Sequence, residues 1–134
     1  MPISYHVFVD ARLVLCRASG DLTDEDVIDN QKSFVADAGF DPSFTQLIDL
    51  TRVTNAKLTA ELGDKLEYAF DPGVRRSMLA EGEFFYGMSR MFQMLNVQGH
   101  REALQVYQDL DAALQWIELA RDDYEKLIKD LPAV

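Results

Sequence analysis

The side chains able to perform nucleophilic or acid–base chemistry are few in this sequence and lie far apart. It contains one cysteine, Cys16, and two histidines, His6 and His100, among 134 residues. A nucleophilic thiol needs a nearby base or cation to lower its pKa, and neither histidine stands in a recognised pattern relative to Cys16. We interpret Cys16 as a small core residue without a disulfide partner and His6 as an exposed strand residue.

An acidic cluster at Asp24, Glu25 and Asp26 has the composition of a metal site. It is better explained as the first turn of a helix, where carboxylates suit the positive end of the helix dipole. Thr23 is a good N-cap, and Asp26 stands at the capping-box position. The sequence also has no glycine-rich phosphate loop, zinc-ligand spacing or serine elbow. We therefore predict no enzyme activity, no metal and no cofactor.

The stretch TQLIDLTRVTNAKLT, residues 45–59, has the pattern of a central strand followed by a site. The apolar run at 46–50 predicts a buried strand, and the carboxylate of Asp49 within it needs hydrogen-bond donors. Asp49 either accepts backbone amides from a neighbouring loop or shapes a site at the carboxyl end of the strand. Residues 52–57 then predict a polar turn before the next helix, for which Asn55 or Thr59 is a suitable cap.

A second candidate site is the hydrophobic segment EFFYGMSRMFQMLNV, residues 83–97. Phe84, Met88 and Met91 belong to one stripe at helical spacing, which predicts a helix packed on the core. Phe85 and Tyr86 fall partly outside that stripe, so the helix offers more apolar surface than one face requires. A Met and aromatic stripe is more often core than binding surface. The surplus outside the stripe nevertheless suggests a pocket wall, a mobile flap or a partner contact.

Composition limits the partners. The net charge is −10, with 13 Lys and Arg residues against 23 Asp and Glu residues. Nucleic-acid binding needs clustered cations, and anionic membranes attract basic segments, so we expect no nucleic-acid partner and at most transient membrane contact. No apolar run approaches the roughly 18 residues of a membrane span, and MPISYHVF lacks the features of a secretory signal. We expect a cytoplasmic protein.

Periodicity predicts an alternation of strands and helices in one domain, residues 1–134. A tight hairpin joins strands at 3–9 and 12–18, with Gly20 ending the second strand. The other expected elements are a helix from Thr23 to Gly39, a strand at 46–50, a helix over 58–70, a short strand within 74–80, the 83–97 helix and a strand at 103–107.

The last expected helix starts after Asp109, which is a good N-cap. Its apolar residues recur at steps of three and four, a heptad-like pattern: Leu110, Ala113, Ile117, Ala120, Tyr124, Leu127 and Leu131. An unbroken helix would be about 33 Å long at 1.5 Å per residue, more than one sheet face needs. Either it breaks near Arg121–Asp123 and folds back, or its distal part packs against a second copy in a homodimer.

These elements predict an α/β fold with a mixed sheet of about five strands. Together with SGDLTDED, LIDLTRVT, YGMSRMFQML and VYQDLDAALQWI, the order resembles the bacterial SpoIIAA-like family. That family has the STAS fold of anti-sigma-factor antagonists and is compared with CRAL-TRIO lipid-binding domains. The resemblance covers residues 3–119, which leaves 120–134 as a helical C-terminal extension.

The resemblance implies a possible switch. Anti-sigma-factor antagonists carry an Asp-Ser-Ser-Gly turn after the central strand, whose second serine is phosphorylated. That turn falls on Lys57-Leu58-Thr59-Ala60, where only Thr59 keeps a hydroxyl. A phosphate at a helix N-terminus is electrostatically favourable, and an unmodified threonine there is equally a good cap.

Two functions remain open. The first is a non-catalytic regulatory module of the SpoIIAA-like type that binds a protein partner through Asp49, Arg52, Thr54, Asn55 and Thr59. The alternative is a binding protein for an apolar small molecule or lipid, held between the sheet and the 83–97 helix. Its ligand or flap residues are Phe84, Phe85, Tyr86, Met88 and Met91.

Overall fold

The computed structural model describes residues 2–59, 61–66, 69–94 and 103–132, and the side chains of 63, 64 and 90–94 lie outside this description. Strands and helices alternate after an initial hairpin. In chain order they are β1 (Ile3–Phe8), β2 (Leu13–Thr23), α1 (Asp24–Val35), β3 (Thr45–Lys57), α2 (Leu62–Lys65), β4 (Arg76–Leu79), α3 (Gly82–Met94), β5 (Leu104–Tyr107), α4 (Leu110–Trp116) and α5 (Arg121–Ile128).

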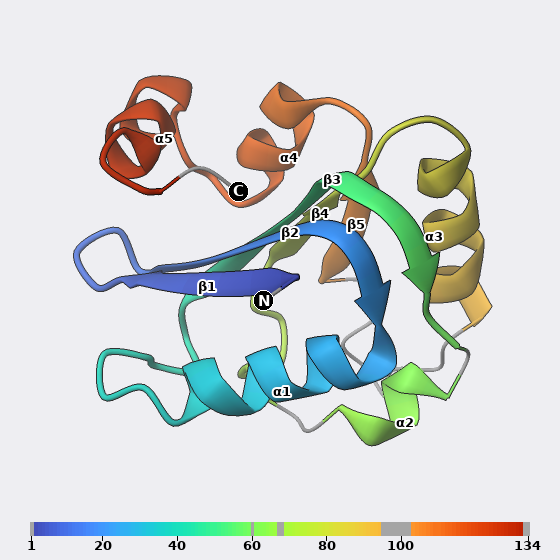
Figure 1. Ribbon diagram of the computed structural model, residues 1–134. Coiled ribbons are helices and arrows are strands. Elements are labelled where there is room, and N and C mark those ends of the chain that lie inside the picture. Colours follow the sequence, from blue (N-terminus) through green and yellow to red (C-terminus); the bar gives the residue numbers. More distant parts are fainter. Residues whose placement is uncertain (1, 60, 67–68, 95–102, 133–134) are drawn as a thin grey trace.

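The five strands form one mixed sheet in the order β1-β2-β3-β4-β5. β1 pairs with β2 in antiparallel fashion, and the other three pairings are parallel. The predicted hairpin and the α/β mixed sheet are therefore confirmed. Figure 1 shows α1 and α2 on one side of this sheet and α4 and α5 on the other, with α3 beside the end of β3.

Alternate strand residues point to the two sides of the sheet and build two separate cores. We call the side covered by α1, α2 and α3 the cavity face. Its buried members are Ile3, Val14, Cys16, Ala18, Leu22, Phe34, Phe44, Leu50, Ala69, Phe70, Met78 and Met88. We call the side covered by α4 and α5 the closed face. Its buried members are Leu13, Leu15, Leu47, Leu79, Ala113, Leu114, Ile117 and Tyr124.

Strands β2 and β3 continue well past their predicted ends. Gly20 does not end β2: it adopts φ +68 within the strand, which runs on to Thr23. The pairing with β3 shifts register between Arg17 and Ser19 and again between Gly20 and Asp21, each time with an extra residue in β3. Such bulges bend and twist strands, and both strands curve toward α1 and α3 in Figure 1.

The same continuation overturns the predicted turn at 52–57 and the helix over 58–70. Those residues were expected to leave the sheet because polar side chains follow Leu50. The structure instead keeps them in β3 as far as Lys57, paired with β2. Of the predicted helix over 58–70, the described residues form a helix only at Leu62–Lys65. Its N-cap is Glu61, so neither Asn55 nor Thr59 caps it.

Helix α1 begins with the predicted capping box. The Thr23 side chain accepts from the Asp26 backbone N–H, and the Asp26 carboxylate accepts from the Thr23 N–H at 3.0 Å. Three acidic residues in this first turn are therefore used as helix-start residues, as the sequence indicates. The helix ends at Val35, four residues before Gly39.

The C-terminal helix is divided in two. α4 ends at Trp116 and α5 starts at Arg121, with Glu118 at φ +59 between them. The heptad-like stripe then packs mainly on the protein's own sheet: Ala113, Ile117 and Tyr124 are buried in the closed face, and Leu127 and Leu131 pack against it. The predicted homodimer thus loses, within the described residues, most of the apolar stripe on which it was based.

Candidate functional site

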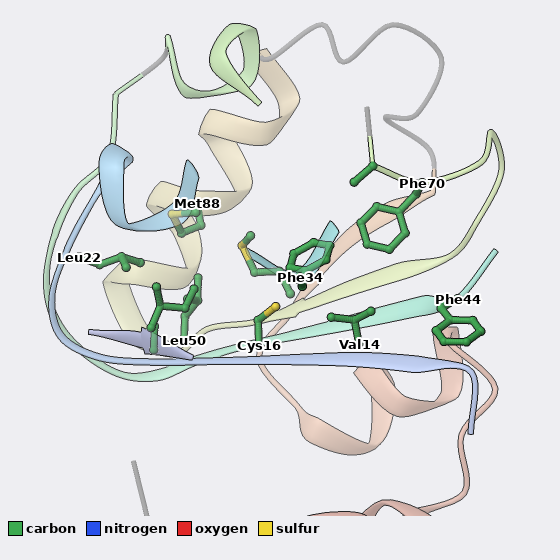
Figure 2. Close-up of a cluster of buried hydrophobic side chains, with 12 residues drawn as sticks. Val14, Cys16, Leu22, Phe34, Phe44, Leu50, Phe70 and Met88 are labelled. Atoms are coloured by element: carbon green, nitrogen blue, oxygen red, sulfur yellow. The ribbon is translucent and has the colours of Figure 1, made fainter. Parts of the chain in front are cut away.

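A cavity of about 90 Å³ lies between the cavity face of the sheet and helices α1, α2 and α3. Protein interiors rarely leave voids larger than a water molecule. Figure 2 shows part of its wall, with Cys16 on the sheet, Phe34 above it and Met88 of α3 on the same side. The lining residues are Ile3, Cys16, Leu22, Val27, Asn30, Gln31, Phe34, Gln46, Ile48, Leu50, Leu58, Leu62, Leu66, Arg76, Met78, Met88 and Leu104.

The bend of β2 and β3 encloses one end of this cavity. Leu22 lies beyond the bulges of the β2–β3 pairing, and Leu50 lies where β3 leaves its pairing with β4. Both side chains are buried within the cluster that contains Met88. The cavity therefore reaches the carboxyl ends of parallel strands, the edge at which open α/β sheets commonly bind ligands.

A polar group forms part of the wall. The Cys16 thiol is 1% exposed and accepts from the amides of Asn30 and Gln46, both at 3.4 Å. Burial raises the pKa of Cys16 to about 11, although the two amides act in the opposite direction. At neutral pH the thiol stays protonated and is a poor nucleophile. The prediction that Cys16 is a core residue is confirmed.

Arg76 adds a cation to this wall. It is the first residue of β4 and pairs with Gln46 of β3, so the two side chains stand next to each other on the cavity face. The guanidinium carbon lies 5.1 Å from the centre of the Phe70 ring, within cation–π range. Burial lowers the pKa of Arg76 to about 10, which leaves it charged at neutral pH.

A second hollow, of about 210 Å³, is lined by residues of β1 and α1. Ile3, Ser4, Tyr5, Asn30 and Ser33 line it. Ile3 and Asn30 line the first cavity as well. The two hollows are therefore adjacent, with Ile3 and Asn30 in the wall of both.

The residues predicted on the 83–97 helix divide into two groups. Met88 is 4% exposed and lines the cavity, and Phe84 packs against the same core. Phe85 and Tyr86 do not line it: their rings pack edge to face with centres 5.3 Å apart, and Tyr86 is 62% exposed. Met91 lies in α3, and its side chain lies outside the described residues, as do residues 95–97.

The residues predicted near the end of β3 do not reach the cavity. Asp49 is half-buried on the opposite side of the sheet from Ile48 and Leu50, and its carboxylate accepts from Thr51 N–H at 2.9 Å and from Thr51 Oγ1 at 2.7 Å. Its partner is therefore two residues along its own strand, not a neighbouring loop. Arg52, Thr54 and Asn55 are exposed.

Thr59 is bonded to Asp24, the first residue of α1. The carboxylate of Asp24 is 9% exposed and accepts from the Thr59 backbone N–H at 2.9 Å and from its hydroxyl. A carboxylate at this position suits the helix dipole as well. The hydroxyl predicted as a switch thus joins the start of α1 to the chain after β3, beside the cavity-lining Leu58.

Asn30, Gln46 and Arg76 were missed as site residues. Each carried a signal, because each interrupts an apolar pattern at a position that points inward. Gln46 precedes Ile48 and Leu50 at strand spacing, and Asn30 stands between Val27 and Phe34 at helical spacing. A polar residue on a buried stripe needs partners, and it is therefore informative about a site.

The other titratable candidates lie elsewhere. His6 is half-buried rather than exposed, and its buried Nε2 atom has no hydrogen-bond partner in the part of the chain that the structure describes. Burial, and then the charge of Arg17, lowers the pKa of His6. His100 lies outside the described residues. Among those that are described, no three His, Cys, Asp or Glu side chains are grouped as a metal site, and no helix is long and apolar enough to cross a membrane.

Comparisons with known proteins bear on the fold. No family model matches the chain, and no curated protein matches it. Among solved structures, it is similar to an uncharacterized protein of the DUF3478 family from Shewanella loihica PV-4, which has a SpoIIAA-like fold. The TM-score is 0.55 at 21% sequence identity, and the match covers 86% of this chain and 93% of the other.

The class defined by these observations is an α/β protein with a mixed five-stranded sheet covered on both faces. Within that class the protein has a SpoIIAA-like fold, as its sequence motifs predicted. The similarity is one of architecture, because at 21% identity it carries no information about ligand or partner.

Proposed function

We propose that this protein binds a small apolar molecule in the cavity between the sheet and helices α1, α2 and α3. The observation that carries the proposal is the cavity itself, about 90 Å³ lined mainly by Leu, Ile, Val, Met and Phe side chains. An unfilled apolar void costs stability, because its lining loses dispersion contacts. A bound apolar molecule would restore those contacts.

The protonation states of the polar groups around the cavity support a role in binding without catalysis. Cys16 is protonated at neutral pH, since burial raises its pKa to about 11. Arg76 remains a cation at neutral pH and therefore offers charge rather than a transferable proton. Neither group is suited to nucleophilic or acid–base chemistry at neutral pH.

The direct test is native mass spectrometry of the protein purified from its own cells. We expect a bound species with a mass of a small organic molecule, and the same spectrum reports the oligomeric state. Titration of the purified protein with isobutane, followed by the methyl NMR signals of its methionines, provides a second readout. Met78 and Met88 line the cavity, so their signals are expected to shift.

A filling substitution makes the test specific. Met88→Trp places a larger side chain at the cavity wall and is expected to abolish binding. Tyr86→Trp is the matched control, because it introduces the same residue in the same helix at a position that is 62% exposed. A ligand-free mass combined with unchanged Met78 and Met88 signals in isobutane would overturn the proposal.

A protein partner is a second candidate, favoured by the free part of β3. In the described residues β4 pairs with β3 only over Gln46–Asp49, and beyond it β3 continues to Lys57 with β2 on one side only. Backbone groups on such an edge can accept an added strand. The exposed side chains of Arg52, Thr54 and Asn55 lie along this stretch.

Arg52→Glu tests this candidate better than a change at Thr59, whose hydroxyl is engaged by Asp24. We expect Arg52→Glu to reduce recovery of a partner from the protein's own cells while the unfolding midpoint stays unchanged. Lys129→Glu makes the same charge change at an exposed position after α5. Equal recovery of the partner with the unmodified protein, Arg52→Glu and Lys129→Glu would rule out this edge of β3 as the contact.

A further inference from the structure

Two buried amide side chains in the cavity wall have hydrogen-bonding groups that the protein leaves unused. Asn30 of α1 and Gln46 of β3 both line the cavity and are each 6% exposed. Each donates one N–H to the Cys16 thiol at 3.4 Å, and within the described residues neither side chain makes another hydrogen bond. A primary amide has two N–H donors and an acceptor oxygen. Each amide therefore keeps one N–H and its oxygen for a further partner.

The two amides converge on one point of the wall. Both bond to the same sulfur atom, so their nitrogens are at most 6.8 Å apart, twice the 3.4 Å of each bond. Buried polar groups cost free energy unless they are hydrogen-bonded, and sulfur is only a weak acceptor. A polar group that enters the cavity beside Cys16 would supply the missing bonds.

The rest of the wall limits that polar group to one small one. Leu22, Leu50 and Met88 line the cavity on the same side of the sheet as Cys16 (Figure 2). These side chains offer dispersion contacts and no hydrogen bonds. The cavity therefore suits a molecule that is hydrocarbon except at the end facing the two amides.

A hydroxyl matches the two amides better than other small polar groups do. It donates one hydrogen and accepts through two lone pairs, so it can donate to one amide oxygen and accept from the N–H of the other amide. A ketone or an ether only accepts, which leaves both amide oxygens without a donor. A hydroxyl also reproduces the hydrogen bonds that a water molecule would make at this point.

We propose that the ligand is a small alcohol, with its hydroxyl between Asn30 and Gln46 and its hydrocarbon part against Leu22, Leu50 and Met88. This inference rests on the proposed function, since it adds one polar group to the mainly apolar ligand of the same cavity. The volume limits the size of the alcohol. A cavity of about 150 Å³ holds benzene, with its six carbons, so one of about 90 Å³ suits about four non-hydrogen atoms.

The test compares three molecules that each have four non-hydrogen atoms around a central carbon: 2-propanol, acetone and isobutane. Binding to the unmodified protein is followed by the methyl NMR signals of Met78 and Met88. We expect 2-propanol to bind at least threefold more tightly than acetone, because acetone cannot donate to an amide oxygen. Isobutane makes no hydrogen bond and reports the apolar cavity alone. This series does not depend on whether a substituted protein folds.

Variants of the two amides locate the effect. Gln46→Met and Asn30→Leu keep the approximate size of the side chain and remove the amide. Each is expected to weaken 2-propanol at least threefold and to leave isobutane affinity within twofold of that of the unmodified protein. Gln115→Met is the matched control, because Gln115 is exposed on α4, away from the cavity lining. The affinities of both molecules are expected to be unchanged in Gln115→Met.

The outcomes separate this inference from the proposed function. Acetone binding as tightly as 2-propanol would overturn the assignment of an alcohol, while isobutane binding would still support an apolar site. Equal loss of 2-propanol affinity in Gln46→Met and Gln115→Met would also overturn the assignment, because the buried amide would then have no particular role. Failure of all three molecules to shift the Met78 and Met88 signals would overturn the proposed function itself.

Discussion

The two faces of the sheet are built from alternate residues of the same strands, yet they are packed differently. On the closed face the one fully buried polar side chain among the described residues, Ser77, donates to the Ala113 carbonyl of α4 at 2.7 Å. On the cavity face, Cys16, Gln46 and Arg76 stand around a cavity of about 90 Å³. On the closed face the polar side chain is bonded to the backbone of a covering helix, whereas on the cavity face several polar side chains border a void.

This difference suggests a division of roles between the faces. Dense packing contributes most to stability, because every lining atom has a contact partner. A face that keeps a cavity gives up part of that stability and gains room for a ligand. The connectivity supports the division: the final two helices close one face locally, whereas α1, α2 and α3 cover the other from separate points along the chain.

Truncating one large side chain on each face should give the largest measurable difference between the two faces in unfolding free energy. Leu47 is fully buried in the closed face, and Leu47→Ala should cost about 2–5 kcal/mol of unfolding free energy. Met88→Ala should cost about 2 kcal/mol or less, because part of the Met88 surface already borders a void. Urea unfolding of both variants measures the difference. Equal losses would mean that the cavity face is as densely packed as the closed face.

Alkaline pH should destabilise the protein through the cavity face. Burial raises the pKa of Cys16 from 9.0 to about 11. Because the folded form holds the proton more tightly, the stabilisation is complete below pH 9 and is lost as the pH rises from 9 to 11. The loss attributable to this thiol is about 2–3 kcal/mol.

The variant Cys16→Ala isolates that contribution, since lysines and tyrosines titrate in the same range. The difference in unfolding free energy between the two proteins should be constant from pH 6 to 8 and should shrink from pH 9 to 11. The thiol of the folded protein should also react slowly with a disulfide reagent at pH 8. A pH-independent difference would contradict the burial argument.

Local signals in the sequence were sufficient for much of this fold. The hairpin and the capping box at Thr23 and Asp26 depend on residues close together in the chain, and both are confirmed. The end of β3 was mispredicted because two bulges shift the pairing register, so Arg52–Lys57 shows no strand periodicity. Only pairing with β2, a long-range contact, keeps those residues in the sheet.

The lining of the cavity was predicted only in part, because some of its residues meet through long-range contacts. Helical spacing placed Met88 on the buried side of α3, where it lines the cavity, since a stripe on one helix is local. It could not show that Phe85 and Tyr86 turn away from the cavity, nor that Gln46 and Arg76 meet across two strands. Polar residues that interrupt an apolar pattern therefore indicated the cavity wall better than the surplus aromatic residues did.

The smallest expected effect concerns the hydrogen bonds that join two walls of the cavity. Thr59 donates its N–H and its hydroxyl to Asp24 at the start of α1, whereas no such contact exists between α1 and the exposed Thr54 among the described residues. Thr59→Val removes one of the two bonds and should cost about 1–2 kcal/mol, since the acceptor is ionised and largely buried. Thr54→Val is the matched control and should change the unfolding free energy by less than about 0.5 kcal/mol.

A double-mutant cycle with Asp24→Asn assigns the Thr59 effect to the pair. The coupling energy should be about 1 kcal/mol and should vanish when Thr54→Val replaces Thr59→Val. Thr59→Glu should destabilise more than Thr59→Val, because it places a second carboxylate against Asp24. A phosphate at Thr59 would meet the same repulsion and would release the chain after β3 from α1. If Thr59→Glu is as stable as the unmodified protein, Asp24 does not hold this segment, and a phosphorylation switch at Thr59 becomes compatible with the fold.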